Sequence, residues 1–124
     1  MSTPPEPPLP RNFLRPSVLL LLREAPAHGY DLLERLRAFG YAGSDPGGLY
    51  RALRALEQDG LVRSAWEHSE SGPDRRIYQL TRAGMEELHG HVEALTETRR
   101  VLDRLLSRYE EFVAVGRASE RMPR

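Results

Sequence analysis

Apolar residues in the C-terminal third of the chain recur every three or four positions over four heptads, and this pattern limits the possible folds most strongly. The run comprises Met85, Leu88, Val92, Leu95, Arg99, Leu102, Leu106, Tyr109 and Val113, in which Arg99 is the one charged member. It predicts a long helix with an apolar seam over residues 83–115. A helix of about 29 residues is about 43 Å long, whereas a compact body of about 80 residues is about 25–30 Å across. We therefore expect the seam to pack against a second copy of the chain.

Two glycines interrupt the start of this long helix. Gly84 and Gly90 both fall in its first turns, and glycine is a poor helix former. Thr81 stands where a capping residue is expected. We expect a bend near the glycines or a break into two helices.

Three shorter helices are expected before residue 60. The first covers residues 12–24 and stops before Pro26. The second, in HGYDLLERLRAFG, has Tyr30, Leu33 and Leu36 on one stripe and is stopped by Gly40. The third begins at Pro46, after Ser44 or Asp45 as a cap, and repeats leucine at i, i+4 and i+7 until residue 58.

The following segment alternates like a two-stranded hairpin. LVRSAWEH and RRIYQL are separated by the turn-rich segment SESGPD at residues 69–74. Trp66, the sole tryptophan, is expected in the core beneath the sheet, and a role in stacking on a ligand is the alternative.

This order of elements predicts a mainly α protein with a small β-hairpin, namely a winged helix-turn-helix with a long C-terminal dimerisation helix. We expect a Pro-rich arm at residues 1–10, a winged-helix DNA-binding domain at 11–82, the dimerisation helix at 83–115 and a flexible tail at 116–124. In a winged helix-turn-helix the third helix enters the major groove and the hairpin reaches the phosphate backbone.

The third helix is expected to have two different faces. At about 100° per residue, Leu49, Leu53 and Leu56 share one side. The opposite side carries guanidinium, amide and phenol groups, which are suited to guanine, adenine and phosphate, and its residues are Tyr50, Arg51, Arg54 and Gln58. The alternatives are that the arginines are ordinary solvated residues and that Tyr50 packs partly into the core.

The start of this helix is glycine-rich. Gly47 and Gly48 lack a Cβ, so that a phosphate can approach the free amides, and Ser44 lies beside them. A simple turn is the alternative. In the hairpin, Arg75 and Arg76 follow SGPD, and strand alternation places at most one of them toward phosphate. Otherwise they form a charged edge that resists strand addition.

The composition excludes several classes of protein. With 18 basic and 18 acidic residues the net charge is zero, so DNA binding has to depend on where the charges lie. The chain has no cysteine, its four histidines lack metal-site spacing, and no segment is long and apolar enough for a membrane span. No nucleophile–base pair or carboxylate dyad appears. We expect a cytoplasmic protein that is not an enzyme and has no metal or cofactor.

Three blocks resemble the PadR family of bacterial transcriptional regulators. They are HGYDLLERL, DPGGLYRALRALEQDGLV and GPDRRIYQLTRAGMEEL, and the resemblance covers about residues 13–106. It implies a winged-helix repressor that dimerises through its C-terminal helix, binds an inverted-repeat operator and is released by a small aromatic or drug-like effector. By position, the family's tyrosine, glycine and basic wing residues correspond to Tyr50, Gly47, Arg75 and Arg76.

Two positions differ from the family pattern, and a tryptophan found in some members is absent from the C-terminal helix. Gly48 stands where threonine or serine is usual, and Arg51 stands where proline is frequent. The single C-terminal helix resembles the short subfamily, some members of which have an effector-lining tryptophan on that helix, whereas Trp66 lies in the hairpin.

The sequence therefore predicts a homodimeric, sequence-specific DNA-binding repressor with double-stranded DNA as its partner. Dimerisation is assigned to Leu88, Val92, Leu95, Arg99, Leu102, Leu106 and Tyr109. A small-molecule effector is expected near Val92, Leu95 and Arg99. For Arg99 itself, register-setting or a salt bridge to Asp103 or Glu97 of the other chain is favoured over pairing with an anionic ligand. The alternative is a winged-helix protein-interaction module without DNA binding, because acidic residues lie close to the expected DNA side.

Overall fold

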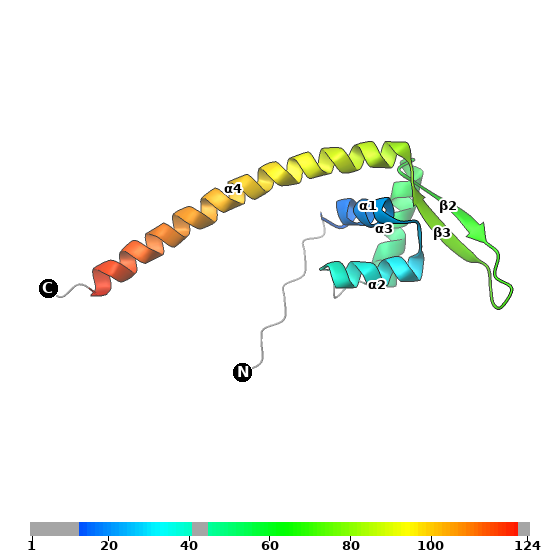
Figure 1. Cartoon of the computed structure of the whole chain (residues 1–124), viewed down its shortest axis with the longest axis horizontal. Coiled ribbons are helices and arrows are strands. Elements are labelled where there is room, and N and C mark those ends of the chain that lie inside the picture. The colour runs from blue at the N-terminus through cyan, green and yellow to red at the C-terminus, as the bar shows by residue number, and fades with distance from the viewer. Residues whose placement is uncertain (1–12, 41–44, 122–124) are drawn as a thin grey trace. The chain divides into compact units, whose positions relative to one another are not determined.

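The computed structural model describes residues 13–40 and 45–121. Ser44 and the arm at residues 1–10 lie outside the described residues. The chain divides into two compact units at His89 and Gly90, which are described separately. The first unit holds α1 (Leu14–Glu24), β1 (Ala27–His28), α2 (Gly29–Phe39), α3 (Pro46–Gln58), β2 (Val62–Glu67), β3 (Arg75–Leu80) and the start of α4 (Arg82–Arg121) (Figure 1).

The ends of α1 and α2 follow from single residues. Ala25 caps α1 in an extended conformation, as expected for the residue before Pro26. Gly40 ends α2 with φ of 147°, a region that L side chains rarely adopt, and its N–H bonds to the carbonyl of Leu36.

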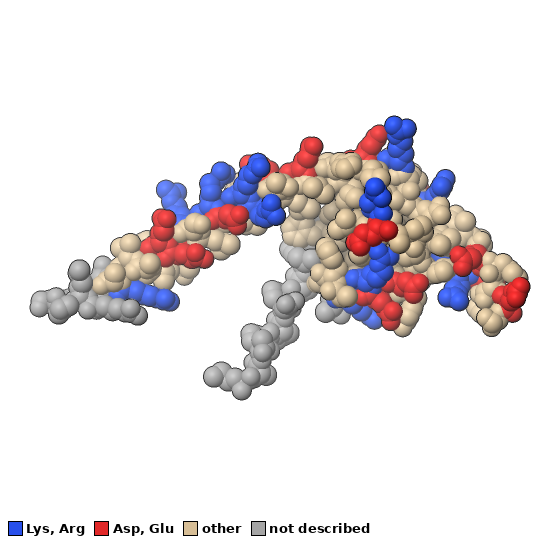
Figure 2. All heavy atoms as spheres, viewed as in Figure 1, with Lys and Arg blue, Asp and Glu red and all other residues tan. Residues whose placement is uncertain are grey.

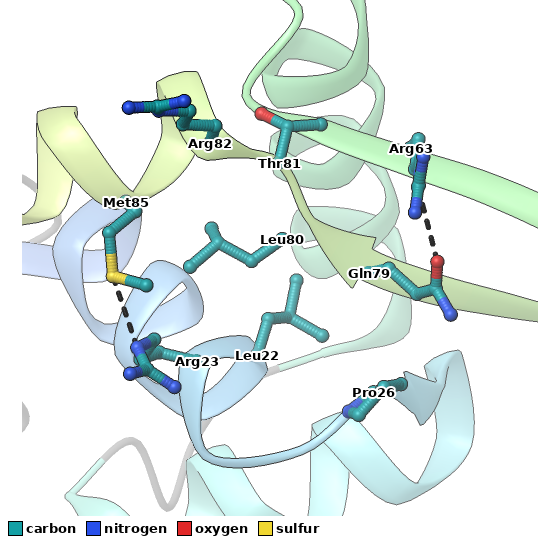
Figure 3. A pocket seen from close by; sticks show the side chains of 9 residues that line it. All are labelled: Leu22, Arg23, Pro26, Arg63, Gln79, Leu80, Thr81, Arg82 and Met85. Carbon is teal, nitrogen blue, oxygen red and sulfur yellow. Dashed lines mark hydrogen bonds between the residues drawn. The ribbon is translucent and has the colours of Figure 1, made fainter.

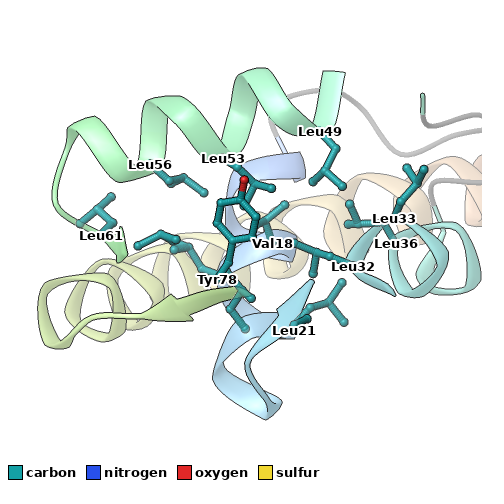
Figure 4. Close-up of a cluster of buried hydrophobic side chains, with 14 of the residues drawn as sticks. Val18, Leu21, Leu32, Leu33, Leu36, Leu49, Leu53, Leu56, Leu61 and Tyr78 are labelled. Atoms are coloured by element: carbon teal, nitrogen blue, oxygen red, sulfur yellow. The ribbon is translucent and has the colours of Figure 1, made fainter. Parts of the chain in front are cut away.

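The core lies between α1, α2, α3 and one face of the sheet (Figure 4). Leu32, Leu53 and Leu56 are almost fully buried there, and each stabilises the fold by about 1.5–3 kcal/mol relative to an exposed position. The expected leucine stripe of the third helix is confirmed. Tyr30, expected on the buried stripe of α2, is exposed instead, since the stripe that faces the core runs through Leu32, Leu33 and Leu36.

The helix α3 and the strand β2 are joined by a rigid turn. Gly60 has φ of +75°, its N–H bonds to the carbonyl of Glu57, and the N–H of Leu61 bonds to the carbonyl of Leu56. These two bonds form a Schellman motif, in which glycine supplies the left-handed residue. The start of β2 is thereby fixed relative to α3.

The sheet has three antiparallel strands in the order β1-β3-β2. The expected hairpin is confirmed as β2 and β3, with Val62 opposite Leu80 and Trp66 opposite Arg76. The two-residue strand β1, which the sequence pattern did not indicate, adds Ala27 opposite Tyr78.

The long helix α4 begins as predicted at a threonine cap. Thr81 Oγ1 accepts the N–H of Gly84 at 3.0 Å and donates to the carbonyl of Gly60 at 2.7 Å. Of the expected bend or break at the glycines, the break does not occur, because α4 runs without interruption from Arg82 to Arg121. Gly84 has a packing reason, since a Cβ there would collide with the carbonyl oxygen of Leu61 and with Leu80.

Leu88 does not belong to an exposed seam. It is 6% exposed and packs in the core of the first unit, and its assignment to dimerisation stays a prediction. The heptad pattern continues from intrachain core positions into exposed ones, and the spacing alone does not show where this change occurs.

Candidate nucleic-acid interface

The predicted two-sided arrangement of α3 is present. Leu49, Leu53 and Leu56 are buried, whereas Arg51, Arg54 and Gln58 are exposed. The buried stripe holds α3 on α1 and α2, so that its polar side chains project from a fixed backbone. That those side chains bind DNA stays a prediction.

Tyr50 is partly packed against the protein and partly exposed to solvent. Its side chain is 46% exposed, yet its ring rests on the start of α2, where a Cβ on Gly29 would lie 2.5 Å from the Tyr50 hydroxyl. Gly29 is thus required for the close approach of α2 and α3. Partial packing leaves about half of Tyr50 available to a ligand.

The amino end of α3 is faced by the protein's own carboxylate. A Cβ on Gly48 would lie 2.8 Å from Asp45 Oδ1, and one on Gly47 would lie 3.3 Å from both Asp45 Oδ2 and Arg51 Nη1. The two glycines therefore make room for Asp45 and Arg51. An anion is favoured at a helix N-terminus, and a DNA phosphate would compete with Asp45 for this position.

The wing arginines lie on opposite faces of the hairpin, as strand alternation predicted. Arg76 shares a face with its partner Trp66, and Arg75 lies on the other face opposite Glu67. Arg76 stacks 5.5 Å from the centre of the Trp66 ring, and its Nε donates to Ser64 Oγ at 2.7 Å. The stack on Trp66 holds the guanidinium group of Arg76 on the face of the hairpin that lies next to α3.

The expected burial of Trp66 is wrong, because its side chain is 68% exposed. Val62, on the same face, is buried over the core, but Trp66 lies four residues further along β2 and near the hairpin tip. The strand β1, which is only two residues long, does not pair with this part of the hairpin. Trp66 is a candidate functional residue that the sequence reasoning placed in the core.

Glu57 connects α3 to the wing. Its Oε1 accepts a hydrogen bond from Ser64 Oγ at 2.5 Å and lies 3.6 Å from Arg76 Nη2. Alternation along β2 places Ser64 and Trp66 together, but no sequence signal pairs them with a residue of α3.

The Tyr78 hydroxyl lies within the same electrostatic neighbourhood. Burial raises the pKa of Tyr78, and the charges of Arg76 and Arg54 oppose this rise while Tyr50 and Glu57 add to it. Charged and polar groups from both α3 and the wing thus influence the pKa of the buried Tyr78 phenol.

Charge on the surface is mixed in sign. Figure 2 shows basic and acidic side chains interspersed on the face in view, in agreement with the net charge of zero. On the candidate interface, the carboxylate of Glu57 lies beside Arg76, so the charge there is mixed as well.

The second unit presents a wide apolar face on α4. Of the remaining residues assigned to dimerisation, Leu95 is half-buried and the others are exposed, namely Val92, Arg99, Leu102, Leu106 and Tyr109. The exposed apolar face also includes residues outside the predicted seam, namely Val101, Leu105 and Phe112. At about 100° per residue these three extend the seam to one side.

Within residues 13–40 and 45–121, no group of three or more histidine or carboxylate side chains is placed to hold a metal ion. No described helix combines the length and the hydropathy that a membrane span needs.

The three-helix body, the hairpin beside α3 and the exposed arginines of α3 define a winged-helix protein of the kind that binds nucleic acid. The sequence profile of the transcriptional regulator PadR-like family matches residues 18–90. The chain is also 39% identical over 99 residues to the transcriptional regulator Rv3488 of Mycobacterium tuberculosis, covering 77% of this chain and 84% of that protein. This chain therefore belongs to the PadR-like family of transcriptional regulators.

Solved structures share the fold. A PadR family transcriptional regulator from Eggerthella lenta is 32% identical with a TM-score of 0.70, covering 77% of this chain and 83% of that chain. A PadR-like regulator from Bacillus cereus is 23% identical with a TM-score of 0.71, covering 77% and 93%.

Proposed function

We propose that this chain is a homodimeric repressor that binds an inverted-repeat operator through α3 and the wing. The observation that carries the proposal is the arrangement of α3, whose leucines are buried while Arg51, Arg54 and Gln58 face solvent. Arginine and glutamine are suited to guanine and adenine edges in the major groove.

In this proposal the wing supplies affinity. Arg76, held on Trp66, contacts phosphate on the α3 side, and Arg75 is exposed on the other face of the hairpin. Contacts to the DNA phosphates position the protein on the duplex but do not distinguish one base sequence from another. We also propose that a DNA phosphate binds at the amino end of α3, beside Gly47, Gly48 and Ser44. There it would displace the Asp45 carboxylate.

Dimerisation is proposed through the exposed face of α4. Leu102, Leu106 and Tyr109 are all exposed large side chains on one side of the helix, and such a patch usually marks an interface. Two copies related by a two-fold axis would place two α3 helices about 34 Å apart, one turn of DNA. Release by a small-molecule effector near Val92, Leu95 and Arg99 completes the proposal.

The test is a titration of the protein into a labelled duplex taken from upstream of its own gene and into a scrambled duplex. We expect the upstream duplex to bind about 10³-fold or more tightly than the scrambled duplex. We also expect the affinity to fall steeply as the salt concentration rises. Trp66, as the sole tryptophan, reports independently, and its emission should change on binding of the upstream duplex alone. Equal binding of the two duplexes would overturn the proposal.

A protein-interaction module without DNA binding is the second candidate. The carboxylates of Asp45 and Glu57 on the candidate interface favour it, because they repel phosphate. The same titration separates the two functions, since a module of this kind binds neither duplex.

A further inference from the structure

A hollow of about 550 Å³ lies in the winged-helix unit (Figure 3). It lies between the end of α1, the strands β2 and β3 and the first turn of α4. No residue of α3 and none of the predicted effector residues lines it. Its lining residues are Leu22, Arg23, Pro26, Arg63, Gln79, Leu80, Thr81, Arg82 and Met85.

The charge of this hollow has one sign. Three arginines line it and no acidic residue does. Some other arginines of the same unit are paired with carboxylates, as in Arg15 with Asp59 and Arg35 with Glu24. Arg23, Arg63 and Arg82 make no ion pair with any residue that the structure describes, and here the three surround one hollow.

The bonds that these arginines do make are to weak or neutral acceptors. Arg23 Nε donates to Met85 Sδ at 3.0 Å, and Arg63 Nε donates to Gln79 Oε1 at 3.1 Å. A guanidinium group has five N–H donors and no acceptor. Most donors around the hollow therefore remain free for a negatively charged partner.

The floor of the hollow is apolar. Leu22 and Leu80 lie between the arginines, with Pro26 at the edge (Figure 3). Thr81 offers little to a ligand, because its hydroxyl already bonds to Gly60 and Gly84. Ligand sites typically combine such an apolar lining with a few orienting polar groups.

We propose that this hollow binds a small organic anion that carries its charge on an apolar body. The arginines hold the anionic group through charge-assisted hydrogen bonds, and the apolar body covers Leu22 and Leu80. A metal ion does not fit, because the lining residues provide no carboxylate or histidine ligand. None of the residues assigned to DNA binding lines the hollow.

The probe is 1-naphthoate, titrated by calorimetry into the full chain at low salt. Its neutral analogue 1-naphthalenemethanol and inorganic phosphate are titrated in parallel. The variants are Arg63→Ala and Arg82→Ala, and the matched control is Arg117→Ala, an exposed arginine in the second unit. Circular dichroism checks that each variant is folded.

We expect saturable binding of 1-naphthoate that weakens by about tenfold in each hollow variant, since loss of a charge-assisted bond costs that much or more, and no change in Arg117→Ala. We expect the neutral analogue and phosphate alone to bind at least about tenfold more weakly. The proposal is overturned if naphthoate shows no saturable binding, if the hollow variants bind it like the wild type, or if either of the other two probes binds equally well.

Discussion

Arg76 of β3 reaches across to α3, where its Nη2 atom lies 3.6 Å from Oε1 of Glu57. The hairpin and the helix are thus connected through a carboxylate within the surface that we propose for DNA. Glu57 has two opposed effects, because it orders Arg76 and Ser64 while also adding negative charge next to the phosphates.

Replacing this carboxylate should strengthen DNA binding. Glu57→Gln keeps an oxygen for the Ser64 hydroxyl but removes the charge, so we expect the dissociation constant for the upstream duplex to fall by roughly 3–10-fold at low salt. The dissociation constant is measured by fluorescence anisotropy of the labelled duplex. Glu97→Gln, which removes an exposed carboxylate on α4, is the control and should have no effect. Weaker binding by Glu57→Gln would show that ordering of Arg76 outweighs repulsion.

Two glycines of α4 should respond oppositely to alanine. Gly84→Ala places a methyl group against the carbonyl of Leu61, whereas a Cβ on Gly90 meets nothing within 4 Å. We expect Gly84→Ala to lower the free energy of unfolding by about 1–3 kcal/mol and Gly90→Ala to raise it by up to about 1 kcal/mol. Urea unfolding measures both changes. A Gly84→Ala variant as stable as the wild type would contradict the close packing described above.

The apolar face of α4 should control the oligomeric state. Leu106→Glu places a charge in the face, and we expect light scattering to give the mass of one 14.1 kDa chain for this variant and twice that for the wild type. Ser107→Glu is the matched control. Ser107 is also exposed, but it lies about 140° from Leu102 around the helix, on the side away from Val101 and Phe112. A dimeric Leu106→Glu variant would refute the proposed interface.

Stability should decline at alkaline pH through Tyr78. Burial raises the pKa of this phenol above its ordinary value of 10.0, so the folded state holds the proton more tightly than the unfolded state. Its contribution is complete below pH 10 and is lost as the pH rises toward the folded-state pKa. Urea unfolding at pH 8 and above pH 10 measures this loss. Between these two pH values the free energy of unfolding should fall less for Tyr78→Phe than for the wild type. Tyr30→Phe, at an exposed position, should behave like the wild type.

Local patterns predicted much of this structure. Leucine spacing located α3 and its two faces, and the threonine at the start of α4 was correctly identified as a cap. The position of Trp66 was not predictable in this way, because alternation gives the face of a strand but not how far the body beneath it extends. The burial of Leu88 within its own chain was not predictable for a related reason, since one heptad pattern serves both an intrachain core and an exposed face. The contact of Glu57 with Arg76 joins residues 19 positions apart, and no local pattern encodes it.

If the outer face of α3 reads DNA, as we propose, the Arg54→Ala variant should bind the upstream duplex more weakly than the wild type. Arg54 is exposed opposite the buried leucines, so its removal should leave stability within about 0.5 kcal/mol of the wild type. We predict about 10–100-fold weaker binding, in line with a lost base contact, and no change for Arg117→Ala. Binding by Arg54→Ala at wild-type affinity would contradict the claim.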